Sequence, residues 1–242
     1  MMTAQINEKP IAADWEGPPQ CKNCGMGDLV LFSSLDIEDF SLIHEPIDKL
    51  TFGKGELLYR AGESADHVFT VREGFVKLTQ NTPNGDEHIV RLLRRGDVTG
   101  LEALVGQTYR HTAIVIDATL ACRIPVAVIS KLDQQLPHFR QELLARWQLS
   151  IDDANTWLME LRTGRVKARV ARLLIQLADT DTDTETAGVI FIPSRDDMGT
   201  MLAATTEAVS RVMAEFKRAG LVKKIAVDRF KVDIEGLLPL SV

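Results

Sequence analysis

Cysteine is scarce in this sequence, and long apolar runs are missing. The 242 residues include three cysteines, an odd number that argues against a disulfide framework and fits a reducing cytoplasm. No stretch approaches the ~18 consecutive apolar residues of a membrane helix, and the first residues lack the pattern of a secretory signal. Motifs of catalytic triads, phosphate-binding loops and dinucleotide-binding glycine turns are also missing. We therefore expect a cytoplasmic protein that has no membrane span and is not an enzyme.

An overall excess of basic residues, the usual sign of a nucleic-acid binder, is also missing, because the formal net charge is −6. The charge is unevenly distributed along the chain. Residues 1–161 contain 15 Lys and Arg against 23 Asp and Glu, whereas residues 162–242 contain 13 against 11. An acidic first part and a mildly basic last part suggest that the two parts have different functions.

The stretch from Thr51 to Ile129 has the pattern of a β domain. Short runs rich in Val, Ile, Leu, Phe and Thr alternate there with glycines. Among these glycines, Gly74, Gly85, Gly96 and Gly106 are spaced by 11, 11 and 10 residues. Turn signals at such spacing are typical of an all-β sandwich or barrel, and the Asn84-Gly85 pair indicates one hairpin.

The segment Phe139–Arg162 has the periodicity of one long helix. Apolar residues recur there at spacings of three and four, as in a helix that packs along one stripe. The stripe either covers the β domain of the same chain or forms the seam of a dimer. We favour the dimer, because Trp147 and Trp157 would otherwise need a large partner within the chain. The predicted seam consists of Phe139, Leu143, Trp147, Ile151, Ala154, Leu158 and Leu161.

Two short helices and a β ribbon are predicted near the end of the sequence. Ser194 with Asp197 three residues later is typical of a helix start. After a short turn at AATT, the apolar residues Val209, Met213 and Phe216 share the inner face of a second helix. The run LVKKIAVDRFKVDI is then typical of a two-stranded wing. This order of elements predicts a winged helix-turn-helix.

The outward face of this second helix carries groups that can read DNA. Arg211 can fork onto guanine, Glu207 can accept from cytosine, and the Ser210 hydroxyl can contact phosphate or methyl groups. The alternative is a solvated face with a Glu207–Arg211 pair one turn apart. The preceding helix-turn and the following wing favour base reading. The candidate DNA-contacting residues are Glu207, Ser210, Arg211, Thr205, Thr206, Lys217 and Arg195.

Most of the chain, about residues 21–234, resembles one family. The run TTEAVSRVMAEFKRAGLV resembles the recognition-helix motif E-x-x-S-R of the CRP/FNR family of bacterial transcription regulators. KGELLYRAGE, VREGFVKL and GDEHIVRLLRRGDVTG resemble the family's cyclic-nucleotide-binding-like β-roll, and Phe139–Arg162 resembles its dimerisation helix. The resemblance implies a homodimer that binds promoter DNA similar to TTGAT-N4-ATCAA and contacts RNA polymerase. It also implies base contacts by Glu207, Ser210 and Arg211.

Together these features predict an α+β protein in four parts. Residues 1–28 form a leader with a C-x-x-C motif, and residues 29–135 form a β-roll sensor domain. Residues 136–164 form the dimerisation helix, and residues 165–242 form the winged helix-turn-helix domain. A signal at the sensor would change how the long helices pair. That pairing sets the spacing of the two recognition helices, which must match about one turn of DNA, ~34 Å.

The residues that hold a cyclic nucleotide in this family are not in place. Leu101 stands where the resemblance requires glutamate, and Thr112 and Ala113 stand where an Arg-Ser pair would be. A cyclic phosphodiester would lack charge-assisted partners, which argues against cyclic AMP. Glu102 and Arg110 lie close to the required positions and keep a cyclic-nucleotide-like effector open. A regulatory module of this type that does not bind DNA is the corresponding alternative.

The cysteines match three of the four ligands of the [4Fe–4S] cluster in the FNR branch of the family. Cys21, Cys24 and Cys122 stand at the corresponding positions, but Val30 stands where the fourth cysteine would be. A four-iron cluster would therefore need a non-cysteine ligand, such as Asp28, a water or an external group. The resemblance thus implies a regulator that responds to oxygen or redox state.

Other chemistries stay open for these thiols. Three thiolates could hold another metal with one non-cysteine ligand, or the C-x-x-C pair could be a reversible dithiol switch. Cys122 could equally be an ordinary buried strand residue. A haem gas sensor is a further alternative, with His67, His88 or His111 as a single ligand.

Overall fold

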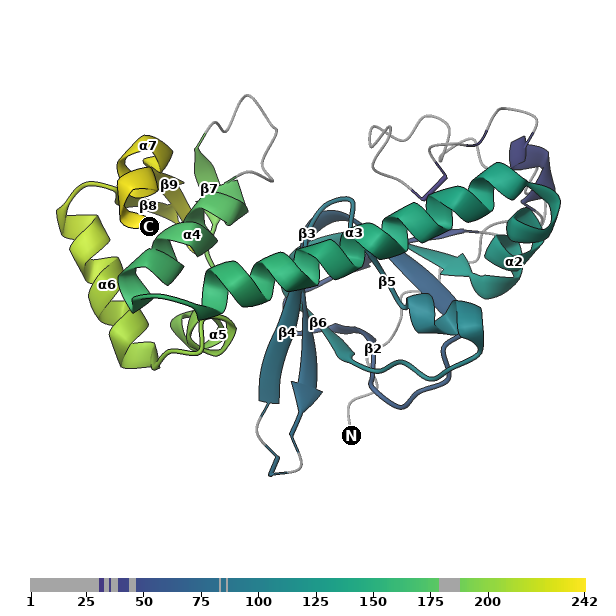
Figure 1. The fold of residues 1–242 in the computed structure, drawn as a ribbon, viewed down its shortest axis with the longest axis horizontal. Helices are drawn as coiled ribbons and strands as arrows, with labels where there is room; N and C mark the ends of the chain where they lie inside the picture. Colours follow the sequence, from purple (N-terminus) through teal and green to yellow (C-terminus); the bar gives the residue numbers. More distant parts are fainter. Residues whose placement is uncertain are drawn as a thin grey trace. The chain divides into compact units, whose positions relative to one another are not determined.

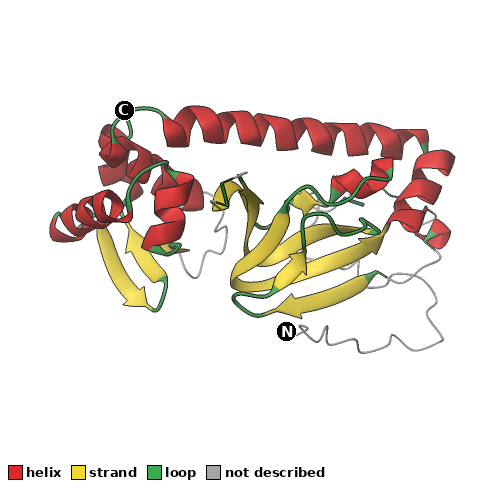
Figure 2. Cartoon of the chain, turned by 90° about the horizontal axis from the view of Figure 1, so that it is seen from below, coloured by secondary structure: helices red, strands yellow, loops and turns green. Residues whose placement is uncertain are grey.

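The computed structural model divides the chain into two units (Figure 1). Unit 1 comprises residues 1–80 and 92–151, and unit 2 comprises residues 81–91 and 152–242. The strands form two separate sheets (Figure 2). The structure describes residues 31–32, 35, 39–43, 47–82, 84–85, 87–178 and 188–242.

The larger sheet has six strands and confirms the β domain predicted from the regular glycine spacing. Its order is β1-β6-β3-β4, with β2 paired to β6 and β5 paired to β3. The longest strands, β3 and β6, run antiparallel, from His67 opposite Pro125 to Thr79 opposite Thr112. The strands are β1 (Asp48–Phe52), β2 (Leu57–Tyr59), β3 (His67–Asn81), β4 (Glu87–Leu93), β5 (Val98–Thr99) and β6 (Thr112–Pro125).

Gly74 lies where the register between β3 and β6 shifts. Its φ of +82° suits glycine, and an added Cβ would lie 2.2 Å from the carbonyl oxygen of Ala118. Register shifts of this kind bend a strand and increase its twist. The two long strands can therefore curl around a shared core, in which Val68, Val76 and Ile124 are buried.

Short helical segments complete the β domain. They are η2 (Asp39–Leu42), η3 (Leu101–Val105) and α2 (Val126–Gln135). In α2 the side chains of Val128, Ile129 and Leu132 are buried, which is the spacing of one helix face. The segment thus adds a covering helix next to the end of β6.

The long helix α3 (Pro137–Arg162) forms as predicted, but some of its apolar residues are buried within the chain and others are exposed. Phe139, Trp157 and Leu161 are buried within the chain, and the Phe139 ring stacks on Phe32 with centroids 6.0 Å apart. A side chain that its own chain already buries is not available to a partner. The assignment of Phe139 and Leu161 to the dimer seam is therefore wrong, and Trp157 needs no external partner.

Other apolar side chains of α3 are exposed at coiled-coil spacing. Leu144, Trp147, Ile151 and Leu158 are 62%, 38%, 48% and 56% exposed. Their positions, with Ala154, follow each other at intervals of three and four residues, the a and d pattern of a heptad. We call this set the α3 stripe: Leu144, Trp147, Ile151, Ala154 and Leu158. Leu143, predicted as a seam residue, is half-buried instead.

Unit 2 has the helix-turn-helix and the wing that the sequence predicts. The wing strands β8 (Val222–Ala226) and β9 (Arg229–Val232) pair as expected, and a third strand, β7 (Val189–Phe191), extends the sheet on the other side of β9. The sequence pattern did not indicate β7. The helical segments are α4 (Val166–Ala178), α5 (Arg195–Met201), α6 (Thr206–Arg218), α7 (Ile234–Leu237) and η5 (Leu238–Leu240). Among the described helices of both units, none is long and apolar enough to cross a membrane.

Candidate nucleic-acid interface and sensor residues

The helix-turn-helix is held by side-chain caps and a close backbone approach. Ser194 caps α5 by accepting a hydrogen bond from the Asp197 backbone N–H at 3.0 Å. An added Cβ on Gly199 would lie 2.8 Å from the carbonyl oxygen of Ala204, so the turn requires the small residue there. Two helices this close to each other share a compact core, whose buried residues are Met198, Met201, Leu202, Val209, Met213 and Phe216.

Thr205 and Thr206, two predicted DNA contacts, are exposed, and their hydroxyl groups also fix the start of α6. The Thr205 hydroxyl accepts from the Ala208 backbone N–H at 3.2 Å, as an N-cap. The Thr206 hydroxyl donates to Asp196 Oδ1 at 2.7 Å and so ties α6 to α5. Asp196, which the sequence analysis did not single out, thus positions the recognition helix. A carboxylate about two turns before the AATT turn is too common a feature to have revealed this role.

Glu207, Ser210 and Arg211 lie together on the exposed face of α6, next to its capped N-terminus. The Glu207 and Arg211 side chains are 84% and 74% exposed, and Arg211 Nη2 lies 2.9 Å from Glu207 Oε1. An exposed pair of this kind contributes only about 0.3–0.5 kcal/mol. Each of the two side chains can therefore leave this ion pair and contact DNA at little cost in free energy.

The predicted DNA contacts Lys217 and Arg195 both contact other side chains of the domain. The Lys217 ammonium lies over the Phe230 ring, 5.3 Å from its centroid, although its residue is exposed. Arg195 is half-buried, and its guanidinium lies 3.0 Å from the Met198 sulfur. Burial lowers the pKa of Arg195, and the nearby Asp228 partly offsets that effect. Lys217 therefore stays on the surface of the domain, whereas Arg195 packs against it.

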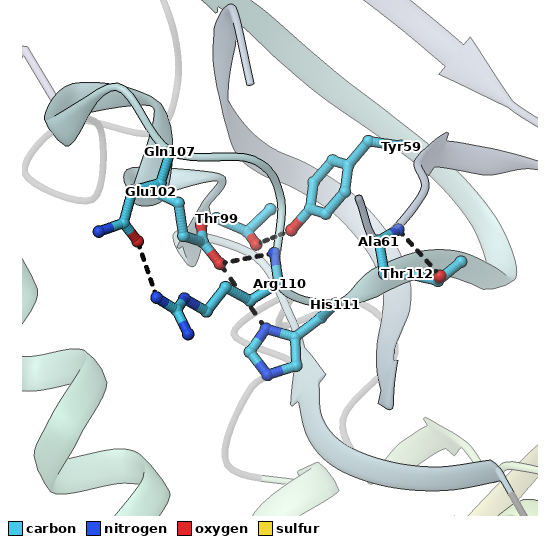
Figure 3. Close-up of polar contacts among 8 residues, drawn as sticks. All are labelled: Tyr59, Ala61, Thr99, Glu102, Gln107, Arg110, His111 and Thr112. Carbon is cyan, nitrogen blue, oxygen red and sulfur yellow. Dashed lines mark hydrogen bonds and ion pairs between the residues drawn. The ribbon is translucent and has the colours of Figure 1, made fainter. Parts of the chain in front are cut away.

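In the β domain, Glu102, Arg110 and His111 contact one another (Figure 3). Glu102 Oε1 accepts from the Arg110 backbone N–H at 3.4 Å and lies 3.7 Å from His111 Nδ1. The Arg110 guanidinium donates to the Gln107 side-chain oxygen at 3.0 Å. Burial alone would raise the pKa of Glu102, but His111 and the backbone N–H groups hold it below its usual value. The carboxylate and guanidinium considered for an effector are thus engaged with the chain itself.

Two tyrosines fill the neighbouring interior. The rings of Tyr59 and Tyr109 stack with centroids 3.9 Å apart, and both residues are about 5% exposed. The Tyr59 hydroxyl hydrogen-bonds the Thr99 hydroxyl (Figure 3), and the Tyr109 hydroxyl donates to the His67 carbonyl oxygen at 2.8 Å. Burial raises the pKa of Tyr109 to about 12. The stack therefore occupies space inside the β domain with satisfied hydroxyl groups.

Of the three candidate cysteine ligands, the structure describes Cys122, while Cys21, Cys24 and the rest of the leader lie outside the described residues. Cys122 is half-buried on β6, and the strand register places it between Lys49 of β1 and Thr70 of β3. The Thr70 hydroxyl is buried and has no hydrogen-bond partner in the described part of the chain. Within the part of the chain that the structure describes, no group of three or more His, Cys, Asp or Glu residues is placed so that it could hold a metal ion.

Comparisons with known proteins agree with this architecture. The family model of the cyclic nucleotide-binding domain matches residues 49–135, and that of the Crp-like helix-turn-helix domain matches residues 168–239. The transcriptional activator protein Anr of Pseudomonas aeruginosa is 30% identical over 205 residues, which cover 84% of each chain. The chain belongs to the CRP/FNR family of transcription regulators.

Two further proteins are similar to this chain over most of its length. Electron transport regulator A of Shewanella oneidensis is 25% identical to this CRP/FNR regulator over 225 residues, 92% of the chain and 90% of the relative. The structure of FixK2 from Bradyrhizobium japonicum superposes with a TM-score of 0.72 over 82% of this chain and 98% of FixK2, at 23% identity. The second similarity concerns the fold alone. The curated relatives are transcription regulators and not enzymes.

Proposed function

We propose that this CRP/FNR regulator binds, as a homodimer, a two-fold promoter site resembling TTGAT-N4-ATCAA, and that it contacts RNA polymerase there. The observation that carries the proposal is the exposed set Glu207, Ser210 and Arg211 on a recognition helix whose N-terminus is capped and tied down. Such groups at the start of a recognition helix reach base edges in the major groove. Lys217, exposed on the same helix, would contact phosphate.

The α3 stripe supports the dimer. Four large apolar side chains that are 38–62% exposed at heptad positions are unusual on a helix that stays single. Pairing two copies along this face would bury them in the manner of a short coiled coil. We infer that Trp147, Ile151, Ala154 and Leu158, together with Leu144, form the seam. The pitch between the two recognition helices would then depend on how the seam packs.

We further propose that the signal is oxygen or redox state, sensed through a [4Fe–4S] cluster on Cys21, Cys24 and Cys122. The half-buried Cys122 thiol on β6 fits a ligand role. The buried hydroxyl of Thr70 lies opposite it on β3 and could donate a hydrogen bond to a cluster sulfur. A bound cluster would supply an oxygen-sensitive redox centre. Three thiolates leave one position for a non-cysteine ligand. The names of the relatives, among them an electron transport regulator, support a redox signal.

The experiment starts from anaerobic purification. A brown protein with stoichiometric iron and sulfide that binds TTGAT-N4-ATCAA DNA, and releases it after exposure to air, would support both proposals. If the protein is colourless and free of iron, and its DNA affinity depends on the concentration of dithiothreitol, the sensor is a thiol switch and not a cluster. A protein that binds this DNA and a scrambled duplex equally would refute the proposed site.

A further inference from the structure

Arg172, on α4 of unit 2, reaches the end of α3. Its Nη1 donates to the Glu160 carbonyl oxygen, and its Nη2 donates to the Thr163 carbonyl oxygen at 2.9 Å. One turn further along α4, the Gln176 amide donates to the Glu160 side chain at 2.6 Å. The last part of α3 is therefore joined to α4 by side chains as well as by the connecting backbone.

The hydrogen bonds of Arg172 depend on how its guanidinium is oriented toward the end of α3. The last carbonyl groups of a helix have no partner within the helix and lie at the negative end of its dipole. A guanidinium placed there makes charge-assisted hydrogen bonds in a fixed fork geometry. In the described structure the Arg172 Nε is buried without a hydrogen-bond partner, so the contacts with the end of α3 are made by the two Nη groups. The fork thus holds α3 at one angle to α4.

Gly164, in the turn between the two helices, makes room for the fork. Its φ is +83°, a conformation that ends many helices and favours glycine. An added Cβ would lie 2.9 Å from Arg172 Nη2. The turn and the guanidinium therefore occupy complementary space.

A second arginine on the same helix holds the helix-turn-helix. Arg169, three residues before Arg172, donates through Nη1 to the carbonyl oxygens of Leu202 and Ala203 at the end of α5. Ala203 has a φ of +47°, so the arginine supports a turn of unfavourable backbone conformation. The helix α4 therefore contacts the end of α3 through Arg172 and the turn before α6 through Arg169.

We propose that Arg172 is a positioning residue that transmits the orientation of α3 to the recognition helix. The inference rests on the proposed function, in which α3 forms the dimer seam and α6 reads a half-site. With the fork intact, the two recognition helices of a dimer are held at one spacing. Without it, the Gln176–Glu160 hydrogen bond and the turn around Gly164 remain, and each DNA-binding domain can rotate more freely to follow a different spacing. Arg172 would therefore determine spacing selectivity without touching DNA.

The test compares three duplexes for wild type, R172A, R172K and the control R165A. They are TTGAT-N4-ATCAA, the same site with an N5 spacer, and a single TTGAT half-site. One added base pair separates the half-sites by about 3.4 Å and rotates them by about 36°. We expect wild type to prefer N4 over N5 by about tenfold or more. R165A removes an exposed positive charge next to α4 and should keep this preference.

For R172A the preference should fall to about twofold or less, while the affinity for the single half-site stays within about twofold of wild type. R172K, which retains one donor but not the fork, should lie between the two and serves if R172A does not fold. Retained N4 preference in R172A or R172K overturns the inference. A loss of half-site affinity equal to the loss on N4 also overturns it, because the residue would then only stabilise the domain. Failure of wild type to bind any TTGAT duplex would instead refute the proposed function.

Discussion

Replacing Arg211 by alanine should impair DNA reading while leaving the fold almost unchanged. In the free protein the side chain is 74% exposed, and its ion pair with Glu207 contributes about 0.3–0.5 kcal/mol. The loss of that pair shifts the unfolding midpoint only slightly. A bidentate contact between arginine and guanine contributes about 1–3 kcal/mol of discrimination. R211A should therefore weaken binding to the proposed site about 5- to 150-fold per half-site.

The assay is fluorescence anisotropy at fixed salt with TTGAT-N4-ATCAA and a set of duplexes that each change one base pair symmetrically. Wild type should penalise a change at the guanine position, and R211A should not. R211K keeps the charge but not the fork, so it should lose the same discrimination with a smaller loss of affinity. K217A is the matched phosphate variant. It should weaken all duplexes alike and reduce the salt slope by about 1.8, which is about 0.9 for each of the two Lys217 side chains of the dimer.

Two results would refute this reasoning. If R211A weakened every duplex by the same factor, Arg211 would act as a general phosphate contact and not as a base reader. If R211A instead unfolded the domain, the exposed position of its side chain would have been misinterpreted. Thermal unfolding monitored by circular dichroism, measured beside the binding series, separates the second result from the first.

Further variants test the seam, the thiols and the β-domain interior. I151E places a charge in the α3 stripe and should convert the dimer to monomer in sedimentation velocity, whereas the same change at exposed Val105 should not. C24S should abolish the response of DNA binding to air, and an unchanged response would exclude that thiol from sensing. Because the folded-state pKa of Tyr109, about 12, exceeds its ordinary value of 10.0, its contribution to stability is complete below pH ~10 and is lost as pH rises through 12. Y109F should flatten the decline of unfolding free energy over that window in urea titrations, and an equally steep decline would contradict the assignment.

The sequence predicts those parts of the fold that depend on local patterns. Regular glycine spacing indicated the β domain because each turn is encoded by neighbouring residues. The helix-turn-helix was predictable for the same reason, since its caps and inner face lie within one short run. β7 was missed because three residues are too few to show a strand pattern.

The errors on α3 have a different cause. Apolar periodicity identifies residues that need cover, but it cannot identify what covers them. Phe139 and Leu161 are covered by their own chain, and Leu144 faces outward where Leu143 was expected. Long-range contacts were equally invisible in the sequence. Thr206 is held by Asp196 from the preceding helix, and nothing local to Arg172 indicates that it caps α3.

The most direct test of the account is the binding stoichiometry and specificity of the anaerobically purified protein. Titration of TTGAT-N4-ATCAA, with mass determination of the complex by light scattering, should show two chains per duplex. The affinity should exceed that for a scrambled duplex of equal length by about 10³-fold or more. One chain per duplex, or equal affinity for both duplexes, would contradict the claim that paired α3 helices present Arg211 and its neighbours to two half-sites.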